Sequence, residues 1–278
     1  MKTTLKSFMV MLACIGLPAR AMATVISYND FSSTAGLTLG GSAVQQGGNI
    51  RLTSLSPTFQ AGGVFSNTAV DINNFSASFT FQFSGNSTPF QADGMAFVIR
   101  NPGSLSLGST GGYLGYGGTD KSNSIVNSVA IEFDNYQNPL DPAGDHIGID
   151  TNGSVTSLVT APVSSAFNGA GTWYAWVDYN GTTLSVSANN TGLKPGTAML
   201  SKNIDIASTI GSSAAYVGFT AATGVWTQNQ DLQSFHYNSD PVPEPSTLLL
   251  TGIGGVLIIG VSRKKVLFDK LGSISKNI

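Results

Sequence analysis

Alternation of apolar and small polar residues is the feature that most constrains the fold. The segment 74–83, NFSASFTFQF, places Phe75, Ala77, Phe79, Phe81 and Phe83 on one face and largely Ser and Thr on the other, because side chains of a strand alternate between faces. Shorter runs of the same character are residues 94–100, 128–134, 146–150, 172–179, 183–189 and 214–222. The dipeptide Asn180-Gly181 predicts a hairpin turn. The pattern predicts an all-β sandwich or barrel and does not choose between them.

Composition supports this class and excludes one group of functions. The chain has 33 Gly and only 10% charged residues, whereas helices would show more Glu, Lys and Leu at helical spacing. Thirteen Lys and Arg balance fifteen Asp and Glu, and no basic run lies in the middle of the chain. We therefore expect no nucleic-acid partner. Residues 24–240 form one predicted domain, which is large enough for a sizeable core.

The N-terminus has the features of a secretory signal peptide, predicted over residues 1–23. Two lysines precede the apolar run FMVMLACIGL, and ARAMA ends in a small-x-small pattern. We expect cleavage after Ala23. The one cysteine, Cys14, lies inside this signal, so the exported domain is expected to hold together without disulfides.

The C-terminal segment 241–265 joins a Pro-rich linker, an uncharged stretch from Ser246 to Ser262, and a basic cluster ending at Lys265. This layout, with VPEPST at 242–247, resembles the PEP-CTERM sorting signal of Gram-negative bacteria. The resemblance implies an exosortase-type processing partner and transient anchoring in the inner membrane by an apolar helix. The expected destination is the cell envelope or the extracellular space. A short tail, 266–278, follows the basic cluster where such signals usually stop, and a plain tail anchor is the alternative.

Acidic residues concentrate at 129–150, VAIEFDNYQNPLDPAGDHIGID. One face of a strand here would carry four oxygen-bearing side chains: Glu132, Asp134, Tyr136 and Asn138. Two carboxylates about 7 Å apart repel unless positive charge lies between them. Asp141 and His146, from the loop that follows, could close over the same spot. Imidazole with carboxylates suits a transition metal, and an all-oxygen set suits Ca²⁺. Spacing alone does not favour a metal site over the simpler interpretation, in which these acids are solvated at the end of a strand.

The segment then resembles a known family. Its pattern V-A-hydrophobic-E-hydrophobic-D-x-aromatic-x-N, followed by D-P-x-x-x-H-I-G-I-D, is similar to the metal-binding region of legume-type (L-type) lectins. Further ordered matches are YNDFSS at 28–33, VFSNTAVDINNFSASFTFQF at 64–83, ADGMAFVI at 92–99, GGYLGYGG at 111–118, VDYNGTTLSVS at 177–187 and AAYVGFTAATG at 214–224. The resemblance implies a jelly-roll β-sandwich of the concanavalin A-like type, with one flat and one curved sheet.

The resemblance also implies two bound cations. Mn²⁺, or another transition metal, would be held by Glu132, Asp134, Asp141 and His146. Ca²⁺ would be held by Asp134, Asn138, Asp141 and the carbonyl of Tyr136. Asp145 and Asp150 fall outside the ligand set.

A shallow sugar site is implied beside the metals. Asp93, after an expected cis Ala92–Asp93 bond, would accept sugar hydroxyls, and Gly112 would donate its backbone N–H. The amide of Asn138 and the ring of Tyr136 would complete the contacts. The loop 222–231 lies where the family sets sugar preference, and Trp226 or Gln228 are weaker candidates there. The predicted function is metal-dependent, weak binding of glycans or polysaccharide.

Two other functions fit parts of the same pattern. A jelly-roll glycoside hydrolase also carries acids at alternate strand positions, but EFDNYQN has no third acid at 136 or 137, and metal binding would occupy the two that are present. We therefore expect no enzyme. A structural envelope or biofilm matrix protein with a lectin fold is the second alternative. The family often pairs through sheet edges, so a homodimer is a further expectation.

Overall fold

The computed structural model describes residues 23–85, 90–104, 106–139, 141–142, 144–169 and 171–239. The predicted signal peptide, apart from Ala23, and the C-terminal segments 241–265 and 266–278 lie outside these ranges. Strands dominate what is described, and the one α-helix there is the short α1 (Ile206–Ile210). Across the same ranges, no helix combines the length and apolarity needed to cross a membrane.

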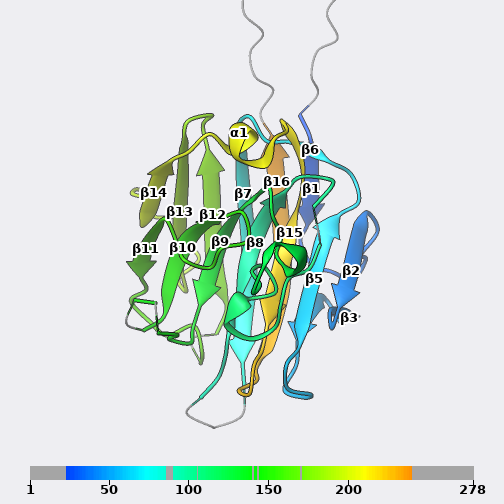
Figure 1. Cartoon of the computed structure of the whole chain (residues 1–278), viewed down its shortest axis with the longest axis vertical. Coiled ribbons are helices and arrows are strands. Elements are labelled where there is room, and N and C mark those ends of the chain that lie inside the picture. The colour runs from blue at the N-terminus through cyan, green and yellow to red at the C-terminus, as the bar shows by residue number, and fades with distance from the viewer. Residues whose placement is uncertain are drawn as a thin grey trace, which may run out of the picture. The chain divides into compact units, whose positions relative to one another are not determined.

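The first sheet has eight strands in an antiparallel arrangement (Figure 1). Its order is β14 (Leu200–Asn203), β13 (Thr183–Asn189), β12 (Trp173–Tyr179), β7 (Phe75–Ser84), β16 (Asn229–Ser239), β4 (Asn49–Thr53) and β3 (Val44–Gln46), with β1 (Val25–Tyr28) also paired to β16. The predicted turn at Asn180-Gly181 joins β12 to β13, where Tyr179 pairs with Leu184. Pairing of β1 with β16 brings the two ends of the described chain together.

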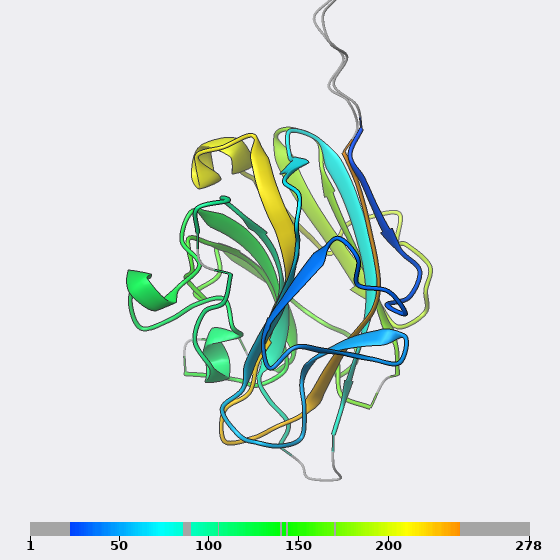
Figure 2. The same ribbon diagram turned by 90° about the vertical axis from the view of Figure 1, so that its right-hand side faces the viewer.

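The second sheet carries the acid-rich segment. Its order is β11 (Val159–Pro162), β10 (His146–Thr151), β9 (Ser128–Asp134), β8 (Gly94–Arg100), β15 (Ala214–Ala222), β5 (Ala61–Ser66) and β2 (Leu37–Gly41), with β6 (Val70–Asp71) also paired to β15. Figure 2 shows the two sheets as separate layers. The fold is therefore a sandwich and not a barrel.

Apolar side chains between the sheets form the main core. On β7 the buried set is the one that alternation predicts: Phe75, Ala77, Phe79, Phe81 and Phe83. The second sheet contributes alternate residues of each strand, including Phe97 of β8, Phe133 of β9 and Phe219 of β15. Phe79 lies with its ring centroid 4.8 Å from that of Phe219, so aromatic contacts join the layers directly.

The outer face of the second sheet is partly covered by the segment between β8 and β9. This segment includes the turns η1 (Gly111–Tyr113) and η2 (Lys121–Asn123). Beneath it lies a smaller apolar cluster, which contains Phe65, Val98, Tyr116 and Ile125. Because this segment shields part of the face from solvent, side chains on β8, β9 and β10 that point outward beneath it are still buried. That burial decides the chemistry of the site.

Candidate functional site

Three adjacent strands arrange the acid-rich residues into rows. Across β8, β9 and β10, Gly94 pairs with Asp134, which in turn pairs with His146. In the next row Glu132 lies opposite Gly148. Directly opposed residues in an antiparallel pair have their side chains on the same face, so both acids and the histidine project from the outer face of the second sheet.

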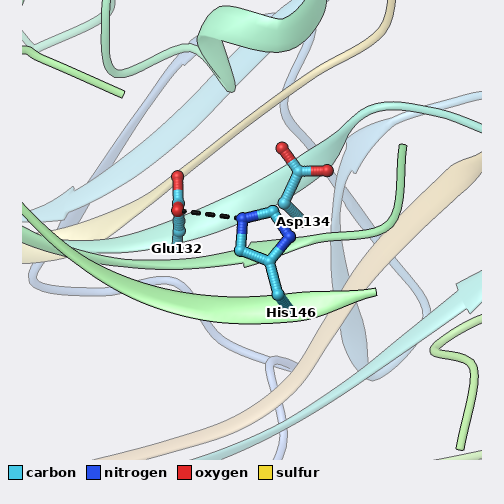
Figure 3. A group of neighbouring side chains, drawn as sticks. All are labelled: Glu132, Asp134 and His146. Atoms are coloured by element: carbon cyan, nitrogen blue, oxygen red, sulfur yellow. Dashed lines mark hydrogen bonds and ion pairs between the residues drawn. The ribbon is translucent and has the colours of Figure 1, made fainter. Parts of the chain in front are cut away.

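These side chains meet in one buried cluster (Figure 3). One ligand atom from each of Glu132, Asp134 and His146 lies within 4.8 Å of the others. The Nε2 atom of His146 is 3.2 Å from Oε1 of Glu132. All three are almost fully buried, with at most 3% of the residue exposed. Burial, followed by smaller contributions that include the negative charge of Glu132, raises the pKa of Asp134 well above its usual value.

A third carboxyl, that of Asp150, lies next to the cluster and is linked to Glu132 through Ser157. Ser157 Oγ lies 2.6 Å from Oε1 of Glu132 and 2.6 Å from Oδ1 of Asp150. A hydroxyl has one proton to donate, so one of these contacts requires a protonated carboxyl. Burial, reinforced by the charge of Glu132, raises the pKa of Asp150 well above its usual value. Ser157 could not be identified from the sequence, because a serine in a loop forms no recognisable pattern.

The loop after β9 begins earlier than the sequence predicts. The strand ends at Asp134, whose Oδ1 accepts a hydrogen bond from the Tyr136 backbone N–H at 2.7 Å. This local turn takes the chain out of the sheet, so Tyr136 and Asn138 do not continue the strand face as alternation implied. Within the loop the two residues contact each other: the Asn138 side-chain amide donates to the Tyr136 carbonyl at 3.2 Å.

Asp141 stays outside the three-residue cluster. Its Oδ2 accepts from the Asn138 backbone N–H at 2.7 Å, and its charge contributes to the raised pKa of Asp134. Asp141 therefore lies near Asp134, which the resemblance assigns to both cations. Its side chain is also hydrogen-bonded to the loop that carries Asn138. Asp145, which the resemblance leaves outside the ligand set, accepts from the Phe167 backbone N–H at 2.6 Å.

Asp93 precedes β8 at the same end of the sheet. The Ala92–Asp93 bond is cis, as the resemblance implied. The Asp93 backbone N–H donates to Ala222 and its carbonyl accepts from Asn135, both at 3.1 Å. Its Oδ2 is buried and has no hydrogen-bond partner among the described residues. Burial, partly offset by the Gly224 backbone N–H, raises the pKa of Asp93 to about 7.

Gly112 approaches Asn138 from η1. A Cβ atom on Gly112 would lie 2.7 Å from Nδ2 of Asn138, a distance that no real side chain tolerates. Both residues line a cavity of about 370 Å³, with Asp141 and Val155 on other walls. Gly224 lies between Asp93 and η1. A Cβ atom on Gly224 would lie 3.4 Å from Oδ2 of Asp93 and 3.6 Å from Cα of Gly111.

The segment expected as a loop over 222–231 is shorter in the structure, since β15 ends at Ala222 and β16 begins at Asn229. Gln228, a weak candidate for ligand contact, is fully buried. Its side-chain amide and that of Asn135 exchange two hydrogen bonds, at 2.8 Å and 3.2 Å. The sequence pattern assigns Asn135 no role, because it occupies the variable position between Asp134 and Tyr136. Trp226 is 38% exposed and packs on Phe90 with ring centroids 4.9 Å apart.

Comparisons with known proteins identify a family for the domain and a motif at its C-terminal side. Residues 23–249 match the model of the legume lectin domain, and residues 241–265 match the PEP-CTERM protein-sorting motif. A receptor kinase of rice, Oryza sativa subsp. japonica, the L-type lectin-domain containing receptor kinase SIT2, is 28% identical over 78% of this chain. A seed lectin of Styphnolobium japonicum is 31% identical over 60% of this chain. The matches span 36% of the kinase and 58% of the seed lectin.

Solved structures give the same result for the fold. The winged bean acidic lectin, determined in complex with methyl-α-D-galactose, superimposes with a TM-score of 0.69 at 25% identity. The superposition covers 79% of this chain and 99% of that lectin. Two antiparallel sheets in a jelly-roll sandwich are thus common to both molecules.

Proposed function

Because the chain belongs to the legume lectin domain family, we propose that it binds glycans in a shallow site formed by Asp93, Gly112, Tyr136 and Asn138. The observation that carries this proposal is the unpartnered oxygen of Asp93. A buried carboxylate oxygen without a donor is costly, and sugar hydroxyls are the donors that the site lacks. The winged bean relative was solved with a galactoside, which supports a sugar ligand here.

Each residue has a separate part in binding. Asp93 accepts hydrogen bonds from two sugar hydroxyls. Gly112 offers its backbone N–H and, having no side chain, lets both Asn138 and a ligand come close. Asn138 contributes its amide, and the half-buried Tyr136 presents its ring to the apolar face of a sugar.

Two cations are proposed to order this loop. The cluster of two carboxylates and an imidazole fits a transition ion such as Mn²⁺, held by Glu132, Asp134, Asp141 and His146. Asp134, Asn138, Asp141 and the Tyr136 carbonyl supply the oxygen atoms that Ca²⁺ prefers. The raised pKa of Asp134 supports this assignment, because positive charge is what would keep that carboxyl ionised. Bound cations would fix the loop before a sugar arrives and so reduce the entropic cost of binding.

Catalysis is not part of the proposal. A glycoside hydrolase needs an acid and a second carboxylate flanking an accessible bond. Glu132 and Asp134 are buried, and Glu132 is already bonded to His146 and Ser157. Neither acid is open to a substrate.

The proposed setting is the cell envelope or the extracellular space. The sorting motif at 241–265 supports export. We propose that residues 1–23 direct export, that an exosortase-type enzyme processes the C-terminal segment, and that an apolar helix there anchors the chain transiently. A homodimer stays a prediction.

The test is binding of neutral glycans by the full-length protein on an array, with Ca²⁺ and Mn²⁺, after EDTA, and after the ions are restored. We expect binding that disappears in EDTA and returns with the ions. Asp93→Asn should abolish binding while keeping the metals, and Asp178→Asn, which alters an exposed carboxylate, should change neither. EDTA-resistant binding of neutral glycans, or none across the array, would contradict the proposal.

A further inference from the structure

A second cavity lies on the outer face of the second sheet, at the far end of β8 from Asp93. Its volume is about 390 Å³, and its walls include Thr38, Phe65, Ser66, Asn67, Arg100 and Tyr216. Asp93 directly precedes β8 and Arg100 is its last residue, so roughly 20 Å of strand separates the two sites. This cavity, here called the Arg100 cavity, is therefore distinct from the proposed metal-dependent site.

Arg100 is the unusual residue in this cavity. The residue is only 8% exposed. Its guanidinium carbon lies 4.6 Å from the ring centroid of Phe65 and 5.0 Å from that of Tyr216. Among the described residues, no Asp or Glu forms an ion pair with it, although a buried charge is normally paired.

The hydrogen bonds of Arg100 leave one edge of the guanidinium without an acceptor among the described residues. Nη1 donates to the Ser104 carbonyl at 2.9 Å. Nε is buried and has no partner in the described chain. The aromatic rings contact the face of the guanidinium. The Nε–Nη2 edge is therefore the part that remains for a hydrogen-bond acceptor from a ligand. Two parallel N–H groups on that edge match the two oxygens of a carboxylate.

The other walls suit a sugar more than an apolar ligand. Ser66 Oγ accepts from the Val217 backbone N–H at 3.2 Å, which leaves its own proton for a ligand. Thr38 and Asn67 bond to each other at the exposed rim. The lining residues named for this cavity include no acidic side chain that would repel an anion.

We propose that the Arg100 cavity is a second ligand site, which binds the carboxylate of an acidic sugar through the Nε–Nη2 edge of Arg100. The carboxylate part rests on the geometry of Arg100 alone. The saccharide part rests on the proposed function, and a free small carboxylate is the other source of the same chemistry. Such a site would let one domain hold an acidic polysaccharide at a point separate from its metal-dependent contact.

The experiment is calorimetry of the full-length protein, stripped of metal with EDTA and then dialysed into metal-free buffer without chelator, because EDTA is itself a polycarboxylate and would compete at Arg100. The ligands are galacturonic acid, its neutral counterpart galactose, and acetate, at equal ionic strength. We expect galacturonate to bind and galactose not to bind. Acetate binding as tight as galacturonate would overturn the saccharide part, and no binding of either carboxylate would overturn the site. Because the protein is metal-free throughout, failure here is separate from failure of the proposed function.

Two variants test the role of Arg100. Arg100→Met should weaken galacturonate binding by about tenfold to a hundredfold, the worth of a charge-assisted hydrogen bond, without lowering the unfolding temperature, because an apolar side chain replaces an unpaired buried charge. Asn67→Asp places an acid on the exposed rim without altering the core and should also weaken binding. Unchanged affinity in either folded variant would overturn the proposal.

Discussion

At the residue scale, burial changes what a carboxyl group can do. The resemblance points to Asp93 but not to its environment: in the fold it is 5% exposed and one oxygen lacks a donor among the described residues. Its pKa therefore rises to about 7, from about 3.9 in an unfolded chain. Near neutral pH the same side chain is poised between a protonated form and an anion that can accept sugar hydroxyls.

This shift predicts how the stability of the metal-free protein depends on pH. The folded state holds the Asp93 proton more tightly than the unfolded state, so the free energy of unfolding falls as pH rises from about 4 to about 7 and then levels off. The raised pKa of Asp134 acts in the same direction. Urea denaturation in EDTA should therefore give a lower midpoint at about pH 8 than at about pH 5.

Asp93→Asn is the matched variant for that measurement. It removes one titrating group, so the difference between the two midpoints should shrink. Saturating Ca²⁺ and Mn²⁺ should shrink it further, because cations favour the ionised carboxyls. A midpoint that rises with pH in EDTA would contradict the assignment.

At the element scale, strand register places the cluster. Pairing of β9 with β10 puts Gly148 directly opposite Glu132. A Cβ on Gly148 would lie 2.3 Å from Oε1 of Glu132 and 2.0 Å from Oγ of Ser157. The glycine thus leaves the space that Glu132 and Ser157 occupy, although it bears no ligand atom itself.

Gly148→Ala tests this arrangement. The added methyl group should displace Glu132 and Ser157, weaken Mn²⁺ binding by about tenfold to a hundredfold, and lower stability. Gly40→Ala is the control, because Gly40 also lies in a strand of the second sheet and a Cβ there meets nothing within 4 Å. Calorimetric titration with Mn²⁺ measures the affinity of both variants. Equal Mn²⁺ affinity in the two variants would show that the strand register does not position Glu132.

At the scale of the whole molecule, aromatic packing holds the two sheets together. The one cysteine of the chain, Cys14, lies in the predicted signal, so disulfides contribute nothing to the domain. Phe79 of the first sheet contacts Phe97, Phe133 and Phe219 of the second, with centroids 4.8–5.6 Å apart. Phe133 lies between Glu132 and Asp134 on β9, so the core and the site share one strand.

Phe79→Ala should lower the free energy of unfolding by about 3–5 kcal/mol, because it opens a cavity between the sheets. Leu193→Ala is the control: that side chain is 77% exposed, and its loss should change stability by less than about 0.5 kcal/mol. Urea denaturation of both variants provides the measurement. Equal stability would mean that the aromatic layer is not what joins the sheets.

Local patterns were sufficient to predict several features of this protein. Alternation identified β7 and its buried face, because a strand has a two-residue period whatever it packs against. The family resemblance pointed to the cluster of Glu132, Asp134 and His146, which the structure brings together. The same resemblance implied the cis bond before Asp93.

Other features depend on residues that meet only when the chain is folded. The Asn135–Gln228 pair and the Ser157–Asp150 contact have no sequence pattern, since their partners come from separate segments. The alternating pattern predicted that β9 continues beyond Asp134. Such a pattern cannot show that the Asp134 side chain accepts a hydrogen bond from the following turn and so ends the strand. Burial of Arg100 without a counter-charge was also invisible, because exposure and pairing are properties of the packed sheets and not of the amino-acid order.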